Sequence, residues 1–315
     1  MIVYSSSVSK GMRSGLALIA VLWVVVFMSS LLIVTLTLLK VDVDENVSEV
    51  QSFKAWQQAH TGLSIGLHPK VERDDPLLQS QDTGYDEGYK VIIEPESTRL
   101  NINHVLQTGD KQLLFSLFKV WGMEDKQVDQ LIDALIDWVD GDELMGLNGA
   151  EKEYYEERGY YDRPYNRPFR ELDELSLVRG FSELELVKPN WREYFTVWTE
   201  GAIDIHEAMP ELLAAAAEVE VSVAEEYNQF VAGDDGVMGT EDDMRLTVSE
   251  ALDDMLSPPG RRELISKRFT ATGKVVRIVS QGHSGSYQCV ITAISGGKTT
   301  AGSLLDYKEK RAQSE

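Results

Sequence analysis

The chain has 315 residues, and its 52 acidic side chains against 30 basic ones give a formal net charge of −22 at pH 7. A chain with this charge repels phosphate backbones and anionic lipid, which argues against a nucleic-acid-binding protein. The single cysteine, Cys289, excludes an internal disulfide and a zinc site built from cysteines. The length allows one large domain or two smaller ones.

The first predicted element is a membrane-spanning helix near the N-terminus. Residues 16–39 contain no charged residue, no proline and no glycine, and about 20 such residues cross a bilayer as a helix. Lys10 and Arg13 precede this segment, whereas four acidic residues follow it between positions 42 and 49. The positive-inside rule therefore places residues 1–15 in the cytoplasm and the rest of the chain beyond the membrane.

The start of this helix resembles the leader of type IV pilin-like proteins. Gly15 ends a short basic leader and precedes the apolar run, so the resemblance implies cleavage by a prepilin peptidase between Gly15 and Leu16, and methylation of the new N-terminus. Most of that superfamily has glutamate at the fifth mature position, where this chain has Ala20. The K-type minor pseudopilins of type II secretion systems lack that glutamate and begin Gly-x-Ala-Leu, as residues 15–18 do here.

The membrane helix is expected to continue as one rod beyond the bilayer. Apolar residues between positions 43 and 67 recur at spacings of three and four, which is typical of an amphipathic helix. The helix should end near His68, because the residue before a proline is disfavoured in the α conformation. Residues 69–88 are expected to form a linker, residues 89–94 a strand and residues 99–103 a second short strand.

The apolar spacing of the rest of the chain predicts helices followed by a β-hairpin. Helical spacing covers residues 110–136, with a break at Trp121 and Gly122, and residues 171–187 around Gly180. Residues 201–206 repeat the pattern of residues 98–103, which predicts an internal repeat of a short strand leading into helices. Alternating apolar residues predict a β-hairpin over residues 268–295, and the last dozen residues are expected to fray.

Five further segments are similar, in order, to the K-type minor pseudopilin family: residues 135–140, 148–155, 165–168, 174–180 and 195–198. The resemblance implies an α+β fold, in which a pilin-like long N-terminal helix packs on an antiparallel β-sheet and a large helical domain, SAM-like or helix-hairpin-helix-like, is inserted between strands. The expected division is a leader (1–15), a transmembrane helix (16–39), the rest of the long helix and first part of the pilin-like domain (40–104), the inserted domain and repeat (105–265), and a C-terminal hairpin and tail (266–315).

The same resemblance implies a location and partners. The chain would be a single-pass inner-membrane protein with a cytoplasmic N-terminus and a periplasmic globular part. It would stand at the tip of the type II secretion pseudopilus and support its initiation, its length control and protein export across the outer membrane. The implied partners are the I-type and J-type minor pseudopilins, other pseudopilins, the prepilin peptidase and exported substrate proteins.

The densest group of carboxylates lies on both sides of a glycine-containing loop. Hard cations such as Ca²⁺ take six to eight oxygen ligands, and such a loop can supply them. The spacing is not that of an EF-hand, because Met145 stands where glycine is required. The family resemblance implies calcium in the inserted domain, and the alternative is a solvated acidic loop. The candidate ligands are Asp137, Asp140, Asp142, Glu151 and Glu153.

A second acidic loop, residues 233–243, also contains glycines that allow tight turns around an ion. Arg245 stands where an EF-hand would have its bidentate glutamate, and the alternative is a mobile acidic turn. The candidate calcium ligands are Asp234, Asp235, Glu241 and Asp242.

No catalytic pattern is complete in the sequence. His206 and Glu207 are not followed by a second histidine at zinc-protease spacing, and residues 282–286 lack the final glycine of a nucleophile elbow. We therefore expect no enzyme. Two other classes remain open: a minor pilin of a type IV pilus, and a membrane-anchored extracytoplasmic hydrolase that uses Asp137, Asp140 and Glu151.

Overall fold

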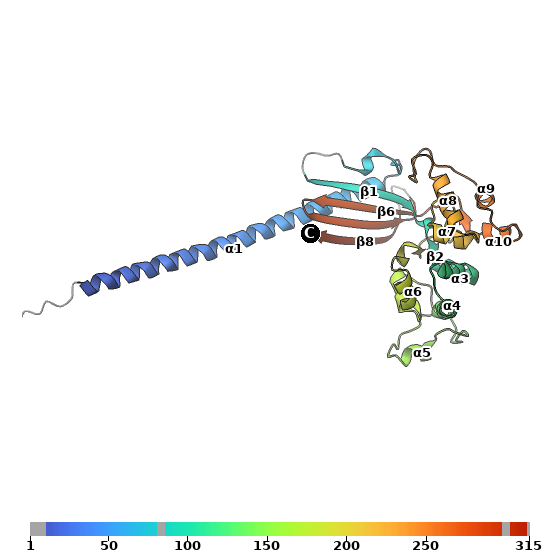
Figure 1. Ribbon diagram of the computed structural model, residues 1–315, viewed down its shortest axis with the longest axis horizontal. Helices are drawn as coiled ribbons and strands as arrows, with labels where there is room; N and C mark the ends of the chain where they lie inside the picture. Colours follow the sequence, from blue (N-terminus) through green and yellow to red (C-terminus); the bar gives the residue numbers. More distant parts are fainter. Residues whose placement is uncertain (1–10, 81–85, 298–302, 314–315) are drawn as a thin grey trace, which may run out of the picture.

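The computed structural model describes residues 11–80, 86–297 and 303–313, and for residues 11–16 and 41–46 it describes the backbone only. One long helix, α1 (Gly11–Gly66), projects far from the rest of the molecule (Figure 1). Its 56 residues correspond to about 84 Å of helix. The helix ends just before Pro69, so the expected rod and its end near His68 are confirmed.

The first half of α1 is an apolar rod. Ala17–Lys40 has a mean hydropathy of 2.8 over 24 residues, and no part of it is buried by other parts of the protein. This stretch is long and apolar enough to cross a membrane. The expected cleavage site, between Gly15 and Leu16, has its backbone in the first turns of α1, and the leader residues 1–10 lie outside the described residues.

The second half of α1 lies along an antiparallel sheet. Within the described residues this sheet has the strand order β1-β6-β7-β8, formed by β1 (Glu87–Pro95), β6 (Val276–Ser284), β7 (Tyr287–Ser295) and β8 (Leu304–Gln313). The hairpin of β6 and β7 turns at Gly285, as expected. It begins at Val276 rather than at residue 268, since Phe269 belongs to a different pairing described below.

The expectation that the C-terminus frays is wrong. β8 pairs with β7 from Leu304 to Gln313, next to the second half of α1. Its contacts with α1 are made by polar side chains: Glu309 accepts a hydrogen bond from the Trp56 indole at 3.1 Å, and Tyr307 lies 3.3 Å from His60. Because charged and aromatic residues rather than aliphatic ones face the helix, hydrophobic alternation gives no signal for this strand.

Small residues let α1 approach the sheet closely. Gly282 of β6 lies against the backbone of Ala55 and Ala59, and a Cβ atom at Gly282 would overlap that backbone. Ser280, on the same face of β6, donates a hydrogen bond to the carbonyl of Ala59 at 2.7 Å. Apolar residues of β1, β6 and β7 complete this smaller core, among them Val91, Ile93, Ile278, Ile291 and the buried Cys289.

A helical domain is inserted between β1 and β6, at the end of the sheet where α1 stops (Figure 1). Its larger core draws on residues from Leu100 to Phe269, so the expected boundaries at 104/105 and 265/266 each fall a few residues inside this domain. Its elements are η2 (Glu96–Thr98), β2 (Leu100–Asn101), α2 (Ile102–Thr108), α3 (Lys111–Val120), α4 (Asp125–Val139), α5 (Lys152–Glu156), η3 (Leu172–Leu177), α6 (Phe181–Val187), η4 (Trp191–Glu193), β3 (Phe195–Thr196), β4 (Ile203–Asp204), α7 (Pro210–Ala217), α8 (Val221–Val231), α9 (Val248–Asp254), η5 (Pro259–Arg261), α10 (Arg262–Ser266) and β5 (Phe269–Thr270).

The predicted internal repeat is present in the inserted domain. β2 pairs in parallel with β3 through Leu100 and Phe195, and β4 pairs in parallel with β5 through Ile203 and Phe269. In both units a polar side chain after the first strand residue caps the following turn: Asn101 accepts from the backbone N–H of His104, and Asp204 accepts from that of His206. The second short strand is shorter than expected, because Ile102 already begins α2.

Candidate functional site

The first acidic loop, which we define as residues 140–151, follows α4 and leads into α5. Asp137, in the last turn of α4, is only 2% exposed and accepts hydrogen bonds from the backbone N–H of Gly146 to both carboxylate oxygens, each at 3.1 Å. Gly149 lies against the same carboxylate, where a Cβ atom would overlap it. The loop therefore folds back over α4 because two glycines allow its backbone to approach Asp137.

Aromatic packing fixes the position of α4 beneath this loop. The fully buried ring of Trp138 contacts Tyr155 edge-on at 5.6 Å between centroids, and it stacks on Phe169 at 6.3 Å. Arg179 closes the loop from the other side by donating a hydrogen bond to the carbonyl of Gly149 at 2.7 Å. These contacts hold Asp137 in place without bringing a cation to its carboxylate.

Burial without a cationic partner raises the pKa values of the loop carboxylates. Desolvation raises the pKa of Glu151 to about 7, and the neighbouring Asp137, Asp140 and Asp142 add to the shift. Desolvation also raises the pKa values of Asp137 and Asp140, each with a nearby acidic residue acting in the same direction. Acidic groups gathered in this way favour the uptake of a proton or a cation.

Two oxygens in the loop have no partner among the described residues. Asp140 Oδ1 and Glu151 Oε1 are both buried, and neither accepts a hydrogen bond. Buried carboxylate oxygens normally have partners, so this pair fits a missing cation or water. Within the described ranges, no three acidic, histidine or cysteine side chains are arranged as a ready metal cage. The donor set is thus of the right chemical type, but it is not assembled into a coordination sphere.

The remaining candidate ligands of this loop lie farther out. Asp142 is exposed and accepts a hydrogen bond from the backbone N–H of Leu144 at 2.8 Å, although its charge still acts on Glu151. Glu153 is exposed in the first turn of α5. Sequence reasoning did not single out Asp133 as a ligand, and the structure pairs it with Lys111 at 3.1 Å and with the backbone N–H of Asn148 at 3.2 Å.

The second acidic loop uses its carboxylates on its own backbone. Asp242 accepts hydrogen bonds from the backbone N–H groups of Asp234 at 2.7 Å and Asp235 at 3.2 Å, and one from the Thr240 hydroxyl at 2.7 Å. Thr240, together with these N–H groups, lowers the pKa of Asp242. Glu241 is exposed. These contacts give the Asp242 carboxylate a structural role within the loop. The prediction that this loop binds calcium stays a prediction.

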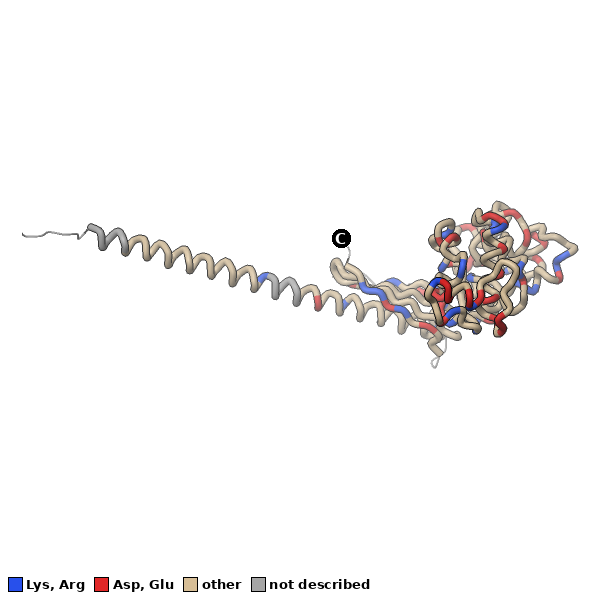
Figure 2. The backbone as a smooth tube through the Cα atoms, turned by 90° about the horizontal axis from the view of Figure 1, so that it is seen from below, with Lys and Arg blue, Asp and Glu red and all other residues tan. Residues whose placement is uncertain are grey.

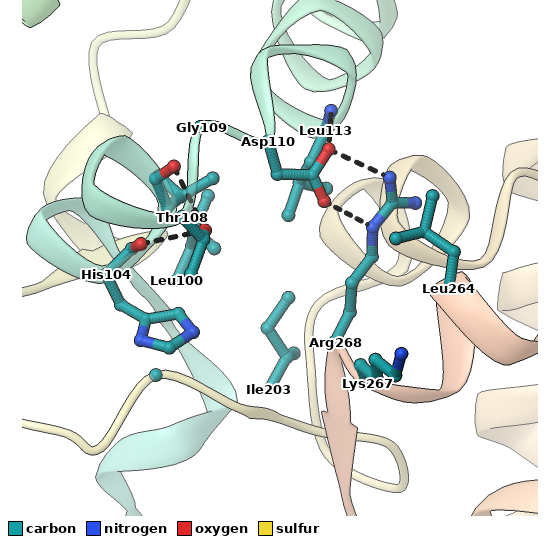
Figure 3. Close-up of a pocket in the computed structure, with 12 residues that line it drawn as sticks. Leu100, His104, Thr108, Gly109, Asp110, Leu113, Ile203, Leu264, Lys267 and Arg268 are labelled. Carbon is teal, nitrogen blue, oxygen red and sulfur yellow. Dashed lines mark hydrogen bonds and ion pairs between the residues drawn. The ribbon is translucent and has the colours of Figure 1, made fainter.

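A cleft of about 350 Å³ separates the two repeat units (Figure 3). Leu100 and Leu113 line it from the first unit and Ile203 from the second. Asp110 and Arg268 close one end with two hydrogen bonds of 2.7 and 3.0 Å. Sequence reasoning missed this ion pair, although the repeat of residues 98–103 in residues 201–206 marks the two units that it joins.

Part of the inserted domain is similar in sequence to known proteins. Residues 98–189 match the family model described as type II secretion system protein K. A curated relative, the type II secretion system protein K of Klebsiella pneumoniae, is 34% identical over 103 residues. Residues 98–189, which lie in the inserted domain, are thus similar to protein K of type II secretion systems. The recognition made from the sequence is confirmed, and four of its five segments, all but residues 195–198, lie inside the region matched by the family model.

A solved structure supports the fold. The chain matches one chain of the crystal structure of the GspK–GspI–GspJ complex from enterotoxigenic Escherichia coli with a TM-score of 0.59 and 12% identity, covering 87% of this chain and 99% of that one. The expected fold class is confirmed. The sequence match to the Klebsiella protein K spans 29% of this chain and 31% of that relative.

Proposed function

We propose that this protein is a minor pseudopilin at the tip of a type II secretion pseudopilus, where it supports initiation, length control and protein export across the outer membrane. The observation that carries the proposal is the joining of two parts in one chain. A helix long enough to span a membrane leads directly into a pilin-like sheet, and residues 98–189 of the inserted domain match protein K.

The proposed mechanism is steric. The inserted domain projects beyond the end of the sheet farthest from the free end of α1 (Figure 1). A subunit stacked above it would meet this domain instead of a second pilin-like sheet. The fifth residue after the proposed cleavage site is Ala20, and a tip subunit has no subunit ahead of it whose N-terminal amine a buried glutamate would pair with.

The proposed location and partners follow from the proposed role as a minor pseudopilin. The chain is anchored once in the inner membrane, with its N-terminus in the cytoplasm and its globular part in the periplasm. The prepilin peptidase cleaves it after Gly15, and the new N-terminus at Leu16 is methylated. Its partners are the I-type and J-type minor pseudopilins, in line with the composition named for the Escherichia coli complex, together with other pseudopilins and exported proteins.

Deletion and complementation test this function. A strain without the protein should retain the secreted enzymes of its type II pathway in the periplasm, while the number of its type IV pili stays unchanged. Complementation with the full chain should restore export, and a variant with residues 98–271 replaced by a short linker should not. Normal export together with loss of pili would assign the protein to the pilus instead.

We further propose that the first acidic loop binds calcium through Asp137, Asp140 and Glu151. The support is the pair of buried carboxylate oxygens without partners, Asp140 Oδ1 and Glu151 Oε1, next to a buried Asp137. A bound Ca²⁺ ion would supply positive charge that neutralises these groups and would order the loop. Asp142 and Glu153 would join only if the loop moved, because both are exposed. Calcium titration of the metal-free protein, followed by thermal unfolding, tests this binding.

A further inference from the structure

Most of the face of the sheet that points away from α1 carries lysines and no acidic residue. Ser280 and Gly282 of β6 contact α1, so Val279, Gln281 and His283 point to the opposite side. Residues paired across antiparallel strands share a face, which extends this assignment to β1, β7 and β8. We call this surface the outer sheet face.

Four successive rows cross the four strands on the outer sheet face, and the row nearest the inserted domain, Glu94, Arg277, Ile294 and Asp306, contains two acidic residues. The other three rows contain none, in a chain with 52 acidic residues among 315. Ile92 is 41% exposed there, and Val279 and Val290 are partly exposed, so the middle of the face is apolar. These three rows are Gly88, His283, Gln288 and Ala312; Lys90, Gln281, Val290 and Lys310; and Ile92, Val279, Thr292 and Lys308.

The lysines of this face lack close carboxylate partners. Lys90 and Lys310 are exposed, and neither forms an ion pair with any residue that the structure describes. Lys308 approaches a carboxylate only at 3.9 Å, at Asp173. By contrast, Lys54 on the α1 side is 3.0 Å from Glu87. Figure 2 marks the basic residues in blue and the acidic residues in red along the backbone, and both colours occur in the strands and in the inserted domain.

The position of the face along α1 favours a protein over a membrane surface. Lys310 lies in the same row as Gln281, next to Ser280, which is bonded to Ala59 of α1. Ala59 is 19 residues (59 − 40) beyond the end of the apolar segment at Lys40, about 28 Å along the helix axis. Screening reduces charge interactions within about 8–10 Å at physiological salt, so lipid headgroups lie outside the reach of these lysines.

We propose that the outer sheet face is a docking surface for a protein partner that presents an acidic surface with an apolar centre. Lys90 on one side and Lys308 and Lys310 on the other would pair with its carboxylates, while Ile92, Val279 and Val290 would cover its apolar residues. Complementary charge of this kind orients a partner and speeds its association, and buried apolar contact then holds it.

Site-specific crosslinking in living cells tests this proposal on the full chain in its own membrane. A photoreactive benzoylphenylalanine is placed at Gln281 or Gln288, both exposed on the face, and at Gln107 of α2 as an off-face control. The crosslinked peptide is then identified by mass spectrometry. The same experiment is repeated with a variant that combines Lys90→Glu, Lys308→Glu and Lys310→Glu.

The matched control combines Lys126→Glu, Lys267→Glu and Lys274→Glu, which changes the net charge equally on exposed lysines away from the face. We expect a protein adduct from the probes at Gln281 and Gln288 and none from the probe at Gln107. The crosslinked peptide of the partner should be rich in Asp and Glu. The yield of the adduct should fall at least tenfold in the face variant and stay within twofold in the control. The absence of an adduct, an adduct to phospholipid only, a peptide without acidic residues, or a yield insensitive to the face variant would overturn the proposal. The readout does not depend on whether export occurs.

Discussion

Glu96 and Arg277 form a two-bonded ion pair, at 2.7 and 2.8 Å, where the inserted domain meets the sheet. Glu96 is completely buried in the short helix after β1, and Arg277 lies on β6. The same carboxylate accepts a hydrogen bond from Thr196 of β3 at 2.5 Å. One side chain thus connects the sheet with the first repeat unit of the inserted domain.

Glu96→Ala should therefore destabilise the protein strongly. The variant leaves the guanidinium of Arg277 and the buried hydroxyl of Thr196 without their partner, and breaking a buried pair in this way lowers the free energy of unfolding by about 3 kcal/mol. Denaturant titration of the detergent-solubilised protein measures the loss. Glu94→Ala is the matched control, because the more exposed Glu94–Arg99 pair should contribute less than about 1 kcal/mol. Equal losses in the two variants would contradict this role for Glu96.

Gly282→Ala should loosen the packing of α1 on the sheet. The added methyl group would overlap the backbone of Ala55 and Ala59, and neither a helix nor a central strand can move aside easily. Overpacking of this kind lowers the free energy of unfolding by about 1–3 kcal/mol. Gly260→Ala serves as the control, since nothing lies within 4 Å of the position that its Cβ atom would occupy. If both variants unfold at the same denaturant concentration, the close approach of α1 to Gly282 is not important for stability.

Calcium should raise the midpoint of thermal unfolding. A ligand that binds only the folded state at 100 times its dissociation constant adds about 2.7 kcal/mol of stability. Glu151→Gln should abolish most of this increase, because it removes a buried ligand charge while keeping the side-chain shape. The control is Glu157→Gln, a change at an exposed carboxylate of the neighbouring turn. An unchanged calcium response in Glu151→Gln would place any calcium site elsewhere.

Without metal, stability should fall as the pH rises from about 4.5 to about 7. The pKa of Glu151 is raised from its ordinary 4.5 to about 7 in the folded protein, so the folded state holds this proton after the unfolded chain has lost it. The stabilisation is complete below pH 4.5 and is lost by about pH 7. Thermal unfolding in the presence of a chelator measures this slope, which Glu151→Gln should reduce. A slope of equal size in the variant would show that other groups cause it.

The sequence predicted the elements whose apolar residues face one core. The rod of α1, the break at Trp121 and Gly122, and the β6–β7 hairpin follow from spacing and from glycine or proline. β8 was missed because its contacts with α1 use Tyr307 and Glu309, which alternate with lysines. Its sequence is that of a charged edge strand, a pattern that hydrophobicity does not distinguish from a polar tail.

The candidate site was predictable in composition but not in detail. The density of carboxylates around residues 137–151 indicated the first acidic loop, and Asp137, Asp140 and Glu151 gather there. That Glu153 is exposed, and that Asp242 caps its own loop, depends on local backbone geometry that spacing does not specify. The outer sheet face could not be found from the sequence, since it requires the register of four strands separated by an inserted domain.

The central claim, that this is a pilin-like subunit and not a protein with an ordinary membrane anchor, is tested most directly at its N-terminus. Intact mass and N-terminal sequencing of the membrane-extracted protein, from cells with and without the prepilin peptidase, report the mature start. We predict a start at Leu16, with the added mass of one methyl group, that depends on the peptidase. A chain that keeps residues 1–15 in cells containing the peptidase, or one that is cleaved beyond Lys40, would contradict the account.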